Sequence, residues 1–97
     1  MTMKFVVFWE YNSEDLKTVI EKFLKLEKLN KKNPQKYPTN VSGPFLFTGE
    51  FKGITVCEAE NDEQIVNFHK YCQPEVKLSF FPVNDLKTTY NLIFHSK

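Results

Sequence analysis

Lys4-Phe5-Val6-Val7-Phe8-Trp9-Glu10 is the stretch that decides the fold of this chain. Alternate residues of a β-strand point to opposite faces of its sheet, and this segment places large apolar side chains on both faces. The chain has two further segments with helical periodicity, and two helices cover only one face of an open sheet. We therefore expect a partner to cover the other face.

The first predicted helix follows this strand directly. Asn12 or Ser13 can cap it, and the acidic Glu14 and Asp15 suit the positive end of the helix dipole. Pro34 ends the helix, because proline cannot continue its hydrogen-bond pattern. The side chains expected to face the sheet recur at helical spacing and are Leu16, Val19, Ile20, Phe23 and Leu26.

Residues 33–44 hold three prolines and no periodicity, which predicts a loop of unusual length. Two interpretations stay open: an irregular crossover, which we favour, or a flap over a pocket with Tyr37 as a contact. Two strands are predicted next, over residues 45–51 and 54–60. Lys52-Gly53 is predicted to join them as an antiparallel hairpin, because glycine accepts a positive φ.

A second helix and a fourth strand complete the pattern. Asn61 is followed three residues later by Gln64, a variant of the capping box that begins a helix. Pro74 ends this helix, and residues 76–83 form the fourth predicted strand. The resulting order of elements is β-α-β-β-α-β.

The tail, residues 85–97, allows two structures. Asp85 can cap a short helix, whereas Tyr90, Leu92 and Phe94 alternate as they would in a strand. We predict a terminal strand or extension that packs on the partner.

The order of elements is typical of one ferredoxin-like domain over residues 1–97. This is an α+β fold with a four-stranded antiparallel sheet, in which the first and third strands are the central pair. A chain of 97 residues has a small core, and pairing through the open sheet face to form a homodimer extends that core.

The charge pattern excludes several classes of partner. The net charge is +1, and all thirteen cationic side chains are lysines, so the planar fork that arginine offers to phosphates is absent. We expect no nucleic-acid partner. No apolar run approaches the ~20 residues that span a bilayer, so we expect no membrane association. Two cysteines are too few for a disulfide framework, which favours reduced thiols and a cytoplasmic location.

Four residues are candidates for a pocket: Trp9, Tyr37, Glu58 and His69. Histidine is the residue type most often used as a general acid or base. His69 lies close to the inner face of the second predicted helix, where it either assists catalysis or simply binds backbone or water. Trp9 and Glu58 are expected at the same end of the sheet, where pockets are common. The cysteines form no CxxC pair, so no metal site is predicted, and no cofactor can be assigned.

Three segments resemble a known family. They are the opening Met3-Lys4-Phe5-Val6-Val7-Phe8-Trp9-Glu10-Tyr11, then Gly53-Ile54-Thr55-Val56-Cys57-Glu58-Ala59-Glu60-Asn61-Asp62-Glu63, and Phe80-Phe81-Pro82-Val83. Together they are similar to the DUF3303 group of small uncharacterised proteins. That resemblance implies the dimeric α/β-barrel superfamily, in which two ferredoxin-like protomers pack sheet against sheet.

The superfamily contains cofactor-free monooxygenases, haem-degrading enzymes, isomerases and ligand-sensing domains, so the fold does not select a function. The Asn, Trp and His arrangement of the haem-degrading branch is not reproduced by Trp9 and His69. We expect a homodimeric protein that binds a small apolar or aromatic molecule. The alternatives are a cofactor-independent monooxygenase or isomerase, and a purely structural or protein-interaction dimer.

Overall fold

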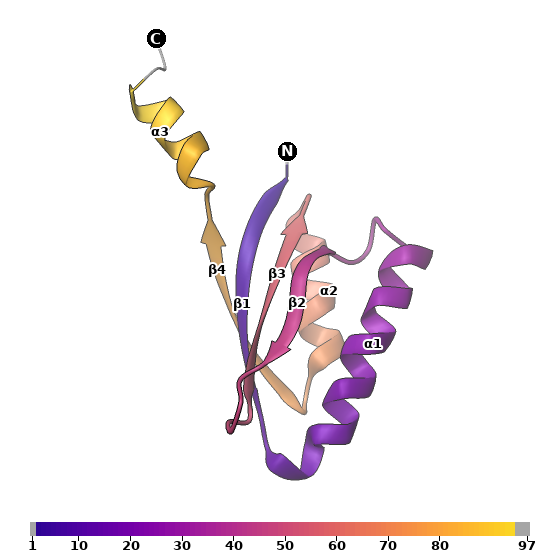
Figure 1. Cartoon of the computed structure of the whole chain (residues 1–97). Coiled ribbons are helices and arrows are strands. Elements are labelled where there is room, and N and C mark those ends of the chain that lie inside the picture. Colours follow the sequence, from indigo (N-terminus) through magenta and orange to yellow (C-terminus); the bar gives the residue numbers. More distant parts are fainter. Residues whose placement is uncertain (1, 95–97) are drawn as a thin grey trace.

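The computed structural model describes residues 2–94 and confirms the predicted order of elements, with a helix added at the end (Figure 1). A short 3-10 turn, Ser13–Asp15, leads into the first helix. The elements are β1 (Met3–Tyr11), α1 (Leu16–Lys32), β2 (Thr39–Leu46), β3 (Lys52–Ala59), α2 (Asp62–Cys72), β4 (Val76–Val83) and α3 (Leu86–Phe94).

The four strands form one antiparallel sheet in the order β2-β3-β1-β4, which is the ferredoxin-like arrangement. The predicted central pair, β1 and β3, is confirmed. Figure 1 shows α1 and α2 side by side on one face of this sheet, while the other face has no helix over it. The protein is therefore α+β, with an open sheet.

The core lies between the sheet and the two helices. Residues of β1 alternate as predicted, since Phe5, Val7 and Trp9 are buried whereas Phe8 is 41% exposed. Trp9 packs against Phe23 of α1, with ring centroids 4.6 Å apart. Phe23 and Phe68 of α2 meet edge to face at 6.4 Å. Aromatic rings from β1, α1 and α2 thus share one cluster.

The buried face of α1 differs from the prediction. Val19 and Phe23 are buried and Leu26 partly so, but Leu16 and Ile20 are 37% and 41% exposed. The sequence carries two adjacent apolar lines on this helix, and periodicity does not say which of them faces the sheet. The rotation of α1 about its axis is set by the ring contacts of Phe23, which exist only in the assembled core.

The hairpin also differs from the prediction. The β2 strand spans Thr39–Leu46, so it begins within the segment 33–44 that was expected to be a loop and includes only the first two residues of the predicted strand 45–51. The turn lies at 47–51, with Gly49 at φ 80°. β2 is an edge strand with two register irregularities, and proline is tolerated in such a strand, which explains Pro44. Gly53, expected in the turn, lies within β3 opposite Trp9.

The predicted cap of α2 is confirmed. The Asn61 side chain accepts a hydrogen bond from the backbone N–H of Gln64 at 3.0 Å. The Gln64 side chain in turn accepts one from the backbone N–H of Glu60 at 2.7 Å and donates to the Pro34 carbonyl at 3.0 Å. One buried amide therefore caps α2 and also fastens the start of the crossover to that helix.

The tail is a helix, so the predicted terminal strand is wrong for residues 86–94. Tyr90 and Phe94 are one helical turn apart, and their ring centroids lie 4.9 Å from each other. The spacing that suggested alternation thus fits helical neighbours equally well. Figure 1 shows α3 extending beyond the end of β4, away from the body of the domain. Residues 95–97 lie outside the described residues.

No helix within residues 2–94 combines the length and the apolar character needed to cross a membrane.

Candidate functional site

A cavity of about 270 Å³ lies in the cleft between α1, α2 and the β2–β3 half of the sheet. Its apolar wall is formed by Phe23, Leu26 and Phe68, and β3 contributes Thr55 and Cys57. The remaining residues that line it belong mostly to the outer turns of α1 and to β2 and are Glu27, Asn30, Lys31, Pro38, Thr39, Asn40 and Pro44. The cavity thus has an apolar interior and a polar rim.

Local sequence rules explain how these elements supply the wall. Phe23, Leu26 and Asn30 follow one another at spacings of three and four, so they lie along one side of α1. Thr55 and Cys57 are two apart on β3 and point to the same face of the sheet. The cavity therefore forms where the helical side meets the strand face.

Asn30 fixes the segment that closes the cavity at the β2 end. Its side-chain amide donates to the carbonyl oxygens of Tyr37 and Pro38, at 3.1 and 3.0 Å. Both amide hydrogens are used, so the crossover is tied to α1 by two bonds in addition to the Gln64 anchor. The end of the crossover, where Pro38 lines the cavity, is thus attached to α1.

Trp9 forms a hydrogen bond with one of the residues that line the cavity. Its indole Nε1 donates to the Thr55 hydroxyl oxygen at 3.1 Å, and both residues are buried, with 2% and 5% of their surface exposed. The ring lies where a Cβ atom at Gly53 would stand, so the absence of a side chain at Gly53 makes room for it. Trp9 therefore positions Thr55 without lining the cavity itself.

Cys57 offers the cavity a neutral thiol. Burial, and to a lesser degree the nearby charge of Glu58, raises the pKa of Cys57 from 9.0 to about 11. At neutral pH this side chain keeps its proton and behaves as a small hydrophobe. The same holds for Cys72 at the end of α2, where burial raises the pKa to about 12.

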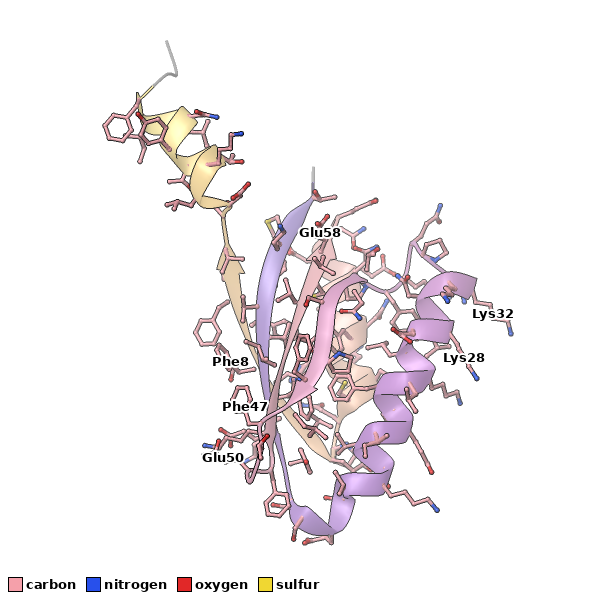
Figure 2. The ribbon with its side chains drawn as sticks, viewed as in Figure 1. Phe8, Lys28, Lys32, Phe47, Glu50 and Glu58 are labelled. Atoms are coloured by element: carbon pink, nitrogen blue, oxygen red, sulfur yellow. The ribbon has the colours of Figure 1, made fainter. Side chains whose placement is uncertain are left out.

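The antiparallel register separates two of the predicted pocket residues. Trp9 faces Gly53 at the start of β3, whereas Glu58 faces Lys4, so the expectation that Trp9 and Glu58 share one end of the sheet is wrong. Glu58 also lies on the other face of β3, with Ile54 and Val56. Figure 2 shows it at the end of the sheet where β1 begins.

Tyr37 and His69 also lie apart from each other. The Tyr37 carbonyl binds Asn30, and its ring meets the Tyr71 ring at 6.5 Å. His69, on α2, lies 6.2 Å from the Phe80 ring and contacts the Gln73 amide at 3.2 Å, beside a separate shallow hollow. The four predicted residues thus do not meet in one cavity, and their contact with a ligand remains a prediction.

None of the residues that line the cavity is among the four predicted pocket residues, and two of these missed residues, Thr55 and Asn30, form side-chain hydrogen bonds to other segments of the chain. Thr55 is the one hydroxyl among the inward-facing residues of β3, which are otherwise Gly53, Cys57 and Ala59. A single hydroxyl among otherwise apolar inward-facing residues is the sequence feature that could have indicated the site. Asn30, by contrast, lies among lysines near the end of a helix, where a polar residue is common. No feature of the sequence therefore indicated its role in the cavity.

Residues 2–94 contain no group of three His, Cys, Asp or Glu side chains arranged to hold a metal ion.

The open face of the sheet is a second surface of interest. By register, Val6 lies between Val56 and Phe81, and Phe8 and Phe81 meet edge to face with ring centroids 5.6 Å apart. The Phe81 side chain is 51% exposed. Figure 2 shows Phe8 on the side of the sheet away from α1, while Lys28 and Lys32 lie on the outer side of that helix. Phe8 and these two lysines therefore face in different directions.

The chain is similar to known proteins in sequence and in fold. A family model described as a domain of unknown function (DUF3303) matches residues 3–95. A crystal structure from Bacteroides thetaiotaomicron, of a conserved protein of unknown function described as a possible oxidoreductase, is similar with a TM-score of 0.52. The two sequences are 18% identical, and the match covers 84% of this chain and 97% of that one. At this identity the likeness concerns the fold alone. No curated protein matches the chain.

Proposed function

The chain belongs to the DUF3303 family, and from the geometry of its cavity we propose that it is a homodimeric small-molecule-binding protein of the dimeric α/β-barrel type. The observation that carries the proposal is the cleft between α1 and the sheet. It combines an apolar wall with a polar rim, which is the usual composition of a ligand pocket. Its ligand is a small apolar or aromatic molecule.

The size of the cavity limits the ligand. An apolar cavity of roughly 150 Å³ accommodates benzene. The cavity here is about 270 Å³, which suits a molecule of about two fused rings. The Phe23 and Phe68 rings, which meet at 6.4 Å, offer such a molecule edge and face contacts.

We expect indane, a hydrocarbon of two fused rings, to bind in this cavity. Titration into isotope-labelled protein is expected to move the backbone amide signals of Thr55, Cys57 and Leu26 in nuclear magnetic resonance spectra. Leu26→Trp is expected to abolish these shifts, because the indole fills the space the ligand needs. Leu24→Trp is the matched control, since Leu24 is 59% exposed on the same helix.

The cavity proposal fails if indane causes no shifts at millimolar concentration in the wild-type protein. It also fails if Leu26→Trp folds and still binds indane as the wild type does.

Apolar exposure on the open face supports the homodimer. Half-exposed phenylalanines at the centre of a sheet face leave apolar surface in water, and pairing two such faces removes it. A second copy of the chain offers the same apolar surface, so a two-fold pairing is self-complementary. This arrangement also leaves both helix–sheet cavities outside the interface.

Phe81→Lys is expected to convert the dimer to a monomer, because it places a charge against the apolar centre of the interface. Light scattering coupled to size-exclusion chromatography checks this, with a wild-type mass near twice the 11.5 kDa of one chain. Val66→Lys is the control, since Val66 is 46% exposed on α2, away from the sheet. A wild-type monomer at 100 micromolar, or a Phe81→Lys dimer, contradicts the proposed interface.

The cysteines support a cytoplasmic location. Cys57 and Cys72 are both free and buried, which suits a reducing compartment.

A further inference from the structure

We propose that the Thr55 hydroxyl donates a hydrogen bond to the ligand, so that the cavity selects neutral two-ring molecules that carry one carbonyl or hydroxyl oxygen at their inner end. This inference rests on the proposed function, because it concerns the same cavity. It adds the chemical class of the ligand and the residue that recognises it.

The hydrogen bond between Trp9 and Thr55 has a fixed direction. An indole N–H can only donate, so at 3.1 Å the Thr55 oxygen is the acceptor. A threonine hydroxyl also carries a proton of its own. The hydrogen bonds found within residues 2–94 give this proton no protein acceptor. Trp9 thus holds the oxygen in place and leaves its donor function unused.

The Thr55 hydroxyl lies in a buried side chain. Thr55 is 5% exposed and lines the cavity. A buried donor without an acceptor is unfavourable, so an oxygen atom that enters the cavity gains a bond the protein does not supply. An acceptor that reaches Thr55 therefore binds more tightly than a hydrocarbon of the same shape.

The inner wall of the cavity is electrically neutral. Besides Thr55, the cavity wall contains the Phe23 and Phe68 rings and the protonated Cys57 thiol. The charged residues of the lining, Glu27 and Lys31, are exposed on α1. A carboxylate at the inner end would lose its hydration without gaining a cation. The site therefore fits a neutral oxygen.

The test compares 1-indanone with indane, which has the same ring system without the oxygen. Dissociation constants are measured by isothermal titration calorimetry or by chemical-shift titration. We expect wild-type protein to bind 1-indanone roughly three- to tenfold more tightly than indane, the range of one neutral hydrogen bond.

Two variants assign the preference to Thr55. Thr55→Val keeps the shape of the side chain and removes the hydroxyl, so the two affinities are expected to become equal. Thr55→Ser keeps the hydroxyl, and we expect it to retain the preference for 1-indanone. Because Thr55→Val also removes the acceptor of the Trp9 indole, thermal unfolding of each variant is measured beside binding.

The outcomes separate the two proposals. Equal binding of indane and 1-indanone by the wild-type protein overturns the role of Thr55 and leaves the cavity proposal intact. A preference for 1-indanone that persists in folded Thr55→Val also overturns it. Binding of neither compound overturns the cavity proposal itself. The wild-type comparison decides the matter even if Thr55→Val does not fold.

Discussion

Gly53→Ala is expected to lower the free energy of unfolding by about 3 kcal/mol, at the upper end of the range for overpacked cores. An added Cβ would overlap the Trp9 ring, which cannot easily move. Trp9 is 2% exposed, its ring centroid lies 4.6 Å from that of Phe23, and its indole N–H donates a hydrogen bond to the Thr55 hydroxyl. The backbone entropy that alanine saves is smaller, about 0.5 to 1 kcal/mol, so the steric effect dominates.

Urea denaturation followed by circular dichroism measures this change. Gly49→Asn is the control, because Gly49 has a positive φ that asparagine tolerates and open space around it. We expect that variant to lose less than about 1 kcal/mol.

The double variant Trp9→Leu with Gly53→Ala tests the stated cause. Leucine leaves room for the new methyl group, so Gly53→Ala should cost much less in that background than in the wild type. If Gly53→Ala lowers the free energy of unfolding equally in the two backgrounds, overlap with the indole is not the reason that alanine is unfavourable at position 53.

Raising the pH from 8 to 10 is expected to lower the free energy of unfolding by about 2 to 3 kcal/mol. The pKa of Cys57 is raised from 9.0 to about 11 and that of Cys72 to about 12, both chiefly by burial. Between pH 9 and 11 the unfolded chain loses these protons while the folded protein keeps them. Stability therefore falls as the pH rises, and the contribution of both thiols is fully present below pH 9.

Chemical denaturation at a series of pH values measures this slope. The double variant Cys57→Ala with Cys72→Ala is expected to have a much flatter alkaline limb, although its cavities lower stability at every pH. Val76→Ala is the control, since it removes methyl groups from an equally buried position without removing a titratable group. If all three proteins have the same slope between pH 8 and 10, the buried thiols are not its cause.

Local patterns were sufficient to predict several elements of the fold. The β4 strand at Val76–Val83 and the cap of α2 at Asn61 are confirmed because each depends on a few neighbouring residues. The order of elements and the central position of β1 and β3 followed from hydrophobic periodicity and the usual topology of such chains. The doubly apolar β1 likewise predicted an apolar sheet face that the helices leave uncovered, and Phe8 is exposed there.

The errors fall where two equally good local patterns compete. β2 begins at Thr39, within a proline-rich segment, because an edge strand with irregular register accepts what a central strand would not. Tyr90 and Phe94 fit both a strand face and a helical turn. The structure of β2 depends on its pairing with β3, which is not a property of the segment itself. The backbone of α3 instead forms its hydrogen bonds within the segment.

The sequence by itself therefore determined the class of fold, the order of its elements and the two faces of β1, because these follow from side-chain alternation and short-range capping. Only the tertiary structure decided the candidate site. Thr55 meets Trp9 across 46 positions, and the cavity depends on which side of α1 turns toward β3. Such contacts arise from the packing of whole elements, and packing depends on shapes that no single segment contains.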